Sequence, residues 1–342
     1  MSTETRSELE VRTDPLETAR QRVEPALRAT LDRLPEAVRP VALYHYGWRD
    51  TEGHEDDAGR GKALRPALTL LSAQAVAPHS NPEEVIAAAV AVDLVHNFSL
   101  LHDDVMDGDL TRRHRATAWS VFGVGPAVLA GDALLTLALQ TLSSLPQAAT
   151  ALADAVQELI LGQIQDLALE RRATVTLDEC LAMATAKTGA LIGVSCALGA
   201  LAAGTPAEPV RQLTRAGRDL GLAFQLTDDV LGIWGDPGVT GKPAGADLRA
   251  RKKSLPVVAA LTSGTPAGAE LAGLYGSATP LSTDQIARAA DLVEEAGGRA
   301  WALNRAEELL SQFEDSLAEG VFDDSGQLAL VSVARRCVRR QS

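Results

Sequence analysis

The sequence is poor in aromatic residues, in cysteine and in lysine, and its charge is predominantly negative. Aromatic residues make up 4% of the 342 positions and hydrophobic residues 46%, so the apolar content is mainly aliphatic. This composition favours helices over sheets and excludes a disordered chain. The net charge of −13 excludes a broad nucleic-acid-binding face and attraction to anionic lipid. It does not exclude a small anionic ligand bound through metal or a few local cations.

The three cysteines, Cys180, Cys196 and Cys337, have neither metal-ligand spacing nor the even number of a secreted disulfide framework. The first twenty residues contain no apolar stretch of the kind found in signal peptides. Residues 188–207 are uncharged but rich in Gly, Ala, Ser and Thr, which favours a buried helix over a membrane span. We therefore expect a cytoplasmic protein without a transmembrane segment.

Helix-capping signals recur along the chain. Asn81-Pro82 opens a run towards Asp109, Thr176 with Glu179 opens one that extends to about Leu201, and Ser282 with Gln285 opens one towards Gly297. Further helices are predicted at Ala127–Ser143, Ala148–Arg171 and Glu208–Ile233, with Gly- and Pro-rich loops at Gly235–Gly245 and Ser263–Ala278. The fold class predicted is all-α: a single domain of long helices at residues 17–342, after a frayed segment at residues 1–16.

Two acidic clusters interrupt apolar helices. Asp103 and Asp107 are four residues apart and share a helix face, with Asp104 beside them. The second cluster is Asp228-Asp229, with Gln225 four residues before Asp229. Carboxylates this close repel unless a cation lies between them, and oxygen-only ligands favour Mg²⁺. If the two helices face each other, the clusters would line the mouth of an apolar cavity.

Basic residues accompany both clusters. The chain has five lysines among its 32 basic residues, and four of the five lie in or near these segments. The basic residues and the glycine of these segments are Gly61, Lys62, Arg65, Arg112, Arg113, Lys242, Lys252 and Lys253, while Lys187 lies on an apolar helix. Surface ion pairs are the simpler explanation, but the concentration favours a polyanion site, with arginine forks and lysine charges on phosphate.

Six segments in this order resemble the trans-isoprenyl diphosphate synthases, the polyprenyl synthetase family. They are GKALRP (61–66), HNFSLLHDDVMDGDLTRR (96–113), GQIQD (162–166), KTGAL (187–191), FQLTDD (224–229) and GKPAGADLRARKKSLP (241–256). The resemblance implies the isoprenoid synthase fold, which is a bundle around a central apolar cavity, and assembly as a homodimer. It also implies head-to-tail condensation of isopentenyl diphosphate with an allylic diphosphate, with pyrophosphate leaving and taking up the released proton.

The resemblance also implies a role for each matching position. Asp103, Asp104, Asp107, Asp228 and Asp229 would hold three Mg²⁺ on the allylic diphosphate, with Arg112, Lys187, Lys242 and Lys252 as basic contacts. Gly61, Lys62, Arg65, His96 and Arg113 match the isopentenyl diphosphate site. His96 lies seven residues before Asp103, nearly on the same helix face. Thr188 and Gln225 would either orient diphosphate, stabilise the cation or pack structurally.

Two positions depart from the family pattern. Gly232 stands where a third Asp usually completes the second motif, and Asp236 is a possible substitute for it. His114 stands where Gly commonly follows the paired arginines.

Product length depends on what closes the cavity floor. Residues four or five before Asp103 lie roughly 6–7.5 Å deeper along a helix. Ser99 shares the face of Asp103 and is small, whereas Phe98 points off that face. An aromatic residue at the position of Phe98 resembles the C20-forming geranylgeranyl synthases, although a packed core Phe is the simpler explanation.

Two other functions share parts of this pattern. A class I terpene cyclase also ionises an allylic diphosphate with metal, but its second motif differs from Asp228-Asp229, and Lys62, Arg65 and Arg113 would have no purpose there. A non-catalytic subunit of a heteromeric synthase tends to lose an aspartate motif, which this chain largely keeps.

Overall fold

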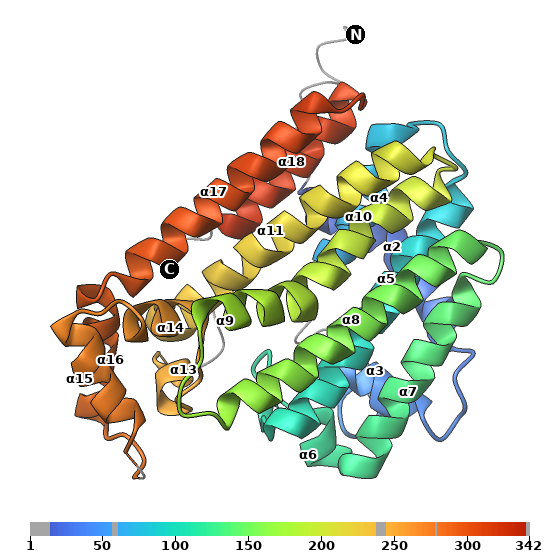
Figure 1. Ribbon diagram of the computed structural model, residues 1–342. Helices are drawn as coiled ribbons and strands as arrows, with labels where there is room; N and C mark the ends of the chain where they lie inside the picture. Colours follow the sequence, from blue (N-terminus) through green and yellow to red (C-terminus); the bar gives the residue numbers. More distant parts are fainter. Residues whose placement is uncertain (1–13, 57–60, 237–243, 278, 340–342) are drawn as a thin grey trace, which may run out of the picture. The chain divides into compact units, whose positions relative to one another are not determined.

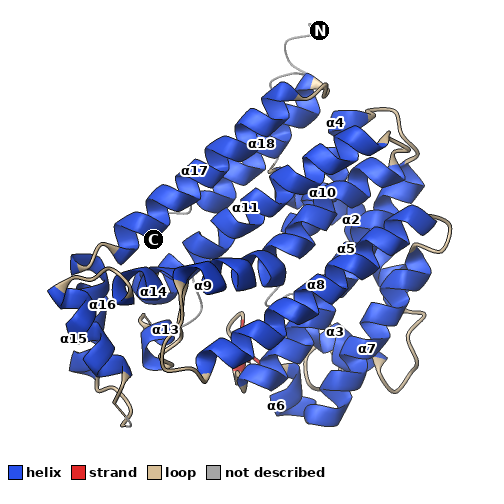
Figure 2. Cartoon of the chain, in the orientation of Figure 1, coloured by secondary structure: helices blue, strands red, loops and turns tan. Residues whose placement is uncertain are grey.

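A computed structural model describes residues 14–56, 61–236, 244–277 and 279–339. Figure 2 shows a helical chain with one short hairpin, β1 (Thr111–Arg112) and β2 (Arg115–Ala116), paired antiparallel. This confirms the predicted all-α class. The helices labelled in Figure 1 or referred to below are α2 (Pro15–Leu31), α3 (Arg39–His45), α4 (Leu64–Val76), α5 (Pro82–Asp107), α6 (Ala118–Phe122), α7 (Val124–Thr141), α8 (Pro146–Glu170), α9 (Leu177–Ala184), α10 (Ala190–Ala202), α11 (Ala207–Trp234), α13 (Ala246–Arg249), α14 (Leu255–Leu261), α15 (Pro266–Tyr275), α16 (Thr283–Glu295), α17 (Gly298–Glu319) and α18 (Asp324–Val338).

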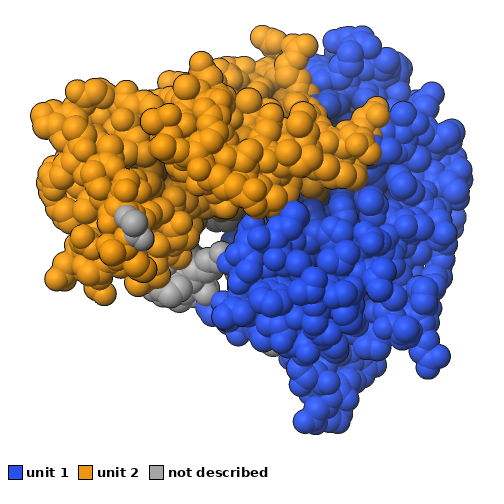
Figure 3. Space-filling view, turned by 60° about the horizontal axis from the view of Figure 1, so that its bottom comes forward, with its two compact units in different colours: residues 1–153, 194–214, 320–333 blue, residues 154–193, 215–319, 334–342 orange. Residues whose placement is uncertain are grey.

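Contacts within the chain define two compact units, which Figure 3 colours separately. Unit 1 comprises Met1–Ala153, Val194–Thr214 and Gly320–Val333, and unit 2 comprises Asp154–Gly193, Arg215–Glu319 and Ala334–Ser342. The helices that contribute residues to both units are α8, α10, α11 and α18.

Helix α5 is the central element of unit 1 and packs against α7, α4 and α2. It begins as predicted, because the Asn81 side chain caps the first turn and Pro82 starts the helix. It ends where Gly108 adopts a left-handed φ of 67°, a conformation that glycine accepts without steric cost. Helix α5 is buried around most of its circumference. The first acidic cluster lies in its last turn, where the helix leaves the apolar core.

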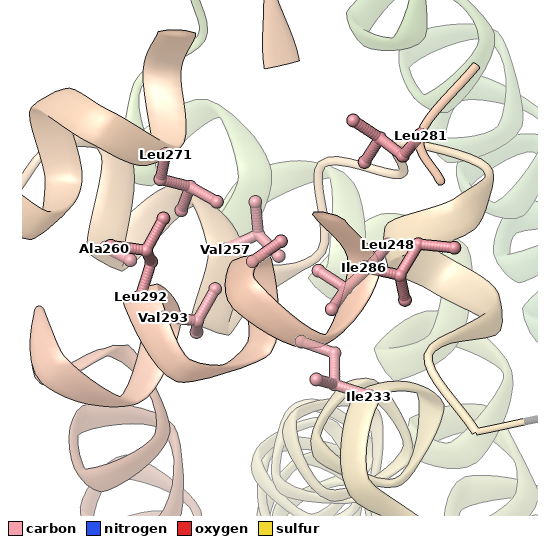
Figure 4. Packing of buried hydrophobic residues seen from close by; sticks show 10 residues of the cluster. Ile233, Leu248, Val257, Ala260, Leu271, Leu281, Ile286, Leu292 and Val293 are labelled. Atoms are coloured by element: carbon pink, nitrogen blue, oxygen red, sulfur yellow. The ribbon is translucent and has the colours of Figure 1, made fainter. Parts of the chain in front are cut away.

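Unit 2 contains a second core, which links the end of α11 to the helices that follow it. Figure 4 shows Ile233 of α11, Leu248 of α13, Val257 of α14, Leu271 of α15 and Ile286 of α16 in one cluster. All five side chains are buried. The cluster therefore fixes the end of α11, four residues beyond the second acidic cluster, against α13 and α16.

The two capping boxes predicted at Thr176–Glu179 and Ser282–Gln285 are confirmed. The helix after the first box runs to Ala202, close to the predicted end, but Thr185–Gly189 forms a π-helical turn within it, between α9 and α10. The prediction of a loop throughout Ser263–Ala278 is wrong, since α15 occupies Pro266–Tyr275 with Thr265 as its cap. Helix α2 begins at Pro15, inside the segment expected to fray. Most of the Gly235–Gly245 loop lies outside the described residues.

The three cysteines are buried and form no disulfide. Burial raises the pKa of Cys196 to about 12 and that of Cys180 to about 11, so both are thiols at neutral pH.

Three helical spans are long and apolar enough to cross a membrane by length and composition: Pro82–Asp107, Val124–Thr141 and Leu177–Ala202. Two thirds of the apolar window is buried within the protein in the first and third of these spans, and one third in the second.

Candidate active site

The first acidic cluster forms the last turn of α5 in unit 1. Asp107 is exposed, Asp103 is half-buried and Asp104 is buried, with 1% of its surface exposed. Oδ1 of Asp104 accepts a hydrogen bond of 2.7 Å from Nε of Arg112, whereas Oδ2 is buried and has no hydrogen-bond partner. Arg112, which the resemblance assigns to the allylic diphosphate, therefore binds Asp104 in this structure.

The surroundings of Asp104 fit a hard divalent cation. Burial raises the pKa of this carboxyl to about 6, and the charges of Asp109 and Asp103 add to the effect of burial while Arg112 opposes it. A buried carboxylate oxygen without a donor is costly unless a cation or proton satisfies it. Among the residues that the structure describes, no three His, Cys, Asp or Glu side chains are already grouped to hold a metal ion. The first cluster thus supplies oxygen donors, but not a preformed cage, which suits a hydrated Mg²⁺.

The paired arginines of the β1–β2 hairpin contact different residues: Arg112 contacts Asp104, and Arg113 lies against Gly61. Arg113 and His114 occupy the turn with left-handed φ values of 51° and 63°. The left-handed conformation of His114 explains why glycine is common at this position in the family. The guanidinium of Arg113 lies against Gly61, where an added Cβ would lie 3.0 Å from a guanidinium nitrogen. The glycine therefore allows the basic segment at 61–65 to approach Arg113 closely.

Lys62, Arg65, His96 and Arg113 form what we call the basic group of unit 1. Arg65 and His96 are its second part. Nη1 of Arg65 lies 3.2 Å from Nε2 of His96. Lys62, which precedes Arg65 on the same segment, is exposed. Burial and the charges of Arg65 and Arg113 lower the pKa of His96 well below its usual value. His96 is therefore a neutral imidazole, with one N–H to donate. The structure brings the five residues expected at the isopentenyl diphosphate site into the same unit, with Gly61 against Arg113 and Arg65 against His96.

A buried polar network supports this basic group, and the sequence reasoning missed it. Nδ2 of Asn97 donates to Oδ2 of Asp93 at 3.2 Å. Burial raises the pKa of Asp93 to about 6, while the Tyr46 side chain and the charge of Arg113 oppose the shift. The available signal was an acidic residue three positions before His96 in an otherwise apolar run.

The second acidic cluster lies on α11 in unit 2, where a chain of hydrogen bonds holds Asp229. Thr188 donates to Oε1 of Gln225, Nε2 of Gln225 donates to Oδ1 of Asp229, and both distances are 2.7 Å. The backbone N–H of Leu255 donates to Oδ2 of Asp229 at 2.8 Å. Thr188 and Gln225 therefore position a carboxylate in this structure, which gives both residues a definite structural task.

The π-helical turn of unit 2 carries Lys187 as well as Thr188. Nζ of Lys187 donates to Oδ2 of Asp166 at 2.6 Å, and Asp166 belongs to the GQIQD segment of α8. Helix α8 approaches the turn closely at Gly162, where an added Cβ would lie 2.7 Å from Cα of Lys187. The wider π-helical turn thus places two neighbouring polar side chains against different partners, as such turns often do at functional sites.

Further basic and acidic groups surround Asp229. Burial raises the pKa of Asp229 to about 6, Lys252 opposes this shift and Asp247 adds to it, so both charges lie near this carboxyl. Asp228 is half-buried beside Asp229. Lys242 lies outside the described residues.

The two residues expected to affect product length are buried in α5. Phe98 is 5% exposed, and its ring meets the ring of His102 edge-on with 4.8 Å between centroids. His102 in turn approaches the backbone oxygen of Val128 on α7, with 3.0 Å between Nε2 and that oxygen. Ser99 donates its hydroxyl to the backbone oxygen of His96. The Phe98 ring is thus packed against a neighbour on α5, and that neighbour, His102, contacts α7.

Comparison with known proteins agrees with this geometry. The polyprenyl synthetase family model matches residues 57–293. A (2E,6E)-farnesyl diphosphate synthase of Mycobacterium tuberculosis is 45% identical over 95% of this chain and 92% of its own length. A geranylgeranyl diphosphate synthase of the same species is 44% identical over 90% of this chain and 89% of its own length.

Solved structures show the same likeness. A polyprenyl synthetase from Streptomyces coelicolor has a TM-score of 0.90 at 43% identity, covering 95% of this chain and 98% of its own. Two other similar structures were determined with isoprenyl diphosphate together with calcium or magnesium. Divalent metal therefore accompanies this fold in related proteins. The chain belongs to the polyprenyl synthetase family and is a prenyltransferase that elongates an isoprenyl diphosphate.

Proposed function

We propose that this prenyltransferase condenses isopentenyl diphosphate with an allylic diphosphate, head to tail, and forms the linear C20 geranylgeranyl diphosphate. The observation that carries the proposal is the buried Asp104, which has one oxygen on Arg112 and the other without a hydrogen-bond donor. Such a carboxylate is suited to a divalent cation that arrives with an anionic substrate. The similar structures with metal and isoprenyl diphosphate support this reading.

We infer that the metal is Mg²⁺, three ions for each active site, bound by Asp103, Asp104, Asp107, Asp228 and Asp229. When bound, Mg²⁺ offsets the negative charge that develops on departing pyrophosphate. Arg112 then exchanges its contact with Asp104 for a diphosphate oxygen. Lys187, Lys242 and Lys252 add positive charge for the same diphosphate, and the Thr188–Gln225 chain keeps Asp229 in position.

The second substrate would bind at the basic group of unit 1. Lys62, Arg65 and Arg113 supply positive charge to isopentenyl diphosphate, while Gly61 keeps the backbone clear of Arg113. His96 donates one hydrogen bond as a neutral imidazole, because its lowered pKa prevents protonation near neutral pH. These residues orient the nucleophilic double bond by holding the diphosphate to which it is attached.

The C20 product is supported by Phe98. Its ring is buried and packed against His102, so it is a fixed barrier within α5. The near-equal identities to a farnesyl and a geranylgeranyl synthase do not decide between C15 and C20.

Three further features complete the proposal. Residues 17–342 are proposed to form one catalytic domain, because each of the helices α8, α10, α11 and α18 contributes residues to both units. The enzyme is proposed to be a cytoplasmic homodimer without a transmembrane segment, in which the apolar spans Pro82–Asp107 and Leu177–Ala202 serve as core helices. Helix α7 exposes Val124, Leu129 and Leu139, which are apolar side chains that a second subunit would cover.

The test is to incubate the purified protein with Mg²⁺, isopentenyl diphosphate and dimethylallyl, geranyl or farnesyl diphosphate. A linear C20 diphosphate is expected. A cyclic hydrocarbon from the allylic substrate alone would instead identify a terpene cyclase. Inactivity until a partner protein is added would identify a subunit of a heteromeric synthase, and a C15 end product would overturn the chain length alone.

A further inference from the structure

The second acidic cluster lacks a carboxylate at the position that would complete its helix face. Gly232 follows Asp228 by four residues and Asp229 by three, so all three positions lie on one side of α11. Asp229 is already held on both oxygens, by Gln225 and by the N–H of Leu255. A metal at this cluster would therefore gain from a further carboxylate near Gly232.

A carboxylate from another helix occupies that space. A Cβ added to Gly232 would lie 2.7 Å from Cγ of Asp247 and would collide with its carboxylate oxygens. Asp247 thus lies where a side chain at position 232 would begin, and only glycine leaves room for it.

The contact is fixed by the residues on either side. The N–H of Gly245 donates to the backbone oxygen of Ile233 at 3.1 Å, which ties the start of α13 to the end of α11. Ile233 and Leu248, the neighbours of Gly232 and Asp247, are 3% and 0% exposed in the core cluster of Figure 4. The backbone around Asp247 is therefore anchored on both sides, so its carboxylate is held at α11 by packing.

We propose that Asp247 supplies, from α13, the third carboxylate of the second acidic motif and takes part in magnesium binding beside Asp228. This assignment rests on the proposed function, because it takes the metal from there. It takes the place of Asp236 as the substitute for the missing third Asp, because the carboxylate of Asp247 supplies the three atoms nearest to a Cβ at Gly232. Gly232 is then a requirement of the site, since a side chain there would displace Asp247.

The experiment measures metal binding instead of turnover. Mg²⁺ is titrated into the full-length protein with saturating inorganic pyrophosphate, and the heat of binding is followed by calorimetry. Asp247→Asn should weaken Mg²⁺ binding about 10- to 100-fold, as loss of a supporting carboxylate typically does. Asp236→Asn is the matched control and should bind Mg²⁺ as the wild type does.

A double variant separates a metal role from a structural one. Gly232→Asp with Asp247→Ala moves the carboxylate to α11 and frees the space it needs, so it should recover most of the lost affinity. Helix content and melting temperature in EDTA establish that each variant is folded. Wild-type affinity in Asp247→Asn, an equal loss in Asp236→Asn, or no recovery in a folded double variant would each overturn the assignment. Because binding is read without the allylic substrate, a failure here is distinct from a failure to form C20 product.

Discussion

Asp104 carries a negative charge that its buried position in the folded protein disfavours. Its pKa of about 6 lies above the ordinary value of 3.8, so the folded state binds more protons between these values. Stability contributed by this group therefore falls as pH rises through that window and stays low above it. Asp104→Asn removes the charge and keeps the shape. We expect a higher melting temperature in EDTA at about pH 8, measured by calorimetry, together with a loss of at least about 100-fold in kcat/KM.

The matched control for Asp104 is Asp107→Asn, in the same motif but exposed. It should lower activity while leaving the melting temperature in EDTA nearly unchanged. A lower melting temperature for Asp104→Asn would mean that the ion pair with Arg112 outweighs the cost of burial, contrary to this account.

Phe98 gives a second test at the scale of one side chain. Phe98→Ala removes a buried ring that packs against His102 on α5, so a growing chain should pass further along α5 and yield products longer than C20. The truncation should also cost about 3–5 kcal/mol of stability, since a buried Phe is lost. Product length is read by chromatography after removal of the diphosphate. Unchanged product length would refute Phe98 as the floor.

The π-helical turn between α9 and α10 is the element whose geometry most directly serves the site. Gly162 of α8 lies against its backbone, and Gly221 of α11 lies against Gly189 at its end, where an added Cβ would lie 2.6 Å from Cα. Gly162→Ala should therefore force α8 away from Lys187. We expect a loss of about 2 kcal/mol or more in the free energy of unfolding, as for other overpacked sites.

Gly273→Ala provides the comparison within the same unit. Gly273 lies in α15 with no atom near its Cβ position, so alanine there should be neutral or stabilise by up to about 1 kcal/mol through helix propensity. Denaturant unfolding of both variants, followed by circular dichroism, measures the difference. Equal stability of the two variants would contradict the close approach of α8 to the turn.

The long helices and the acidic segments were predictable because caps and apolar periodicity are local signals. The capping boxes at Thr176 and Ser282 mark their helices in the sequence itself. Thr265-Pro266 is also a cap, but the surrounding Gly and Pro residues concealed it. The π-helical turn was not predictable, since its altered hydrogen-bond register leaves no sign in composition. The contact between Gly232 and Asp247 depends on how α13 packs, which no local pattern specifies.

At the scale of the whole molecule, the exposed apolar residues of α7 bear on assembly. If a second subunit covers Leu129, Leu129→Glu should convert a dimer of 35.9 kDa chains to monomers, because a buried charge without a partner is costly. Light scattering after gel filtration measures the mass. Leu328→Glu, on the exposed face of α18, is the control and should remain dimeric. A monomeric wild type would refute the homodimer, and a dimeric Leu129→Glu would place the interface elsewhere.

The buried cysteines also make this protein a convenient subject for spectroscopic labelling. Cys180, Cys196 and Cys337 are all shielded from solvent, so maleimide probes should leave the native thiols unmodified in the folded enzyme. One exposed cysteine introduced into each unit would then carry a donor and an acceptor dye without removing any native residue. Energy transfer between the dyes would report the distance between the two units as magnesium and pyrophosphate are added.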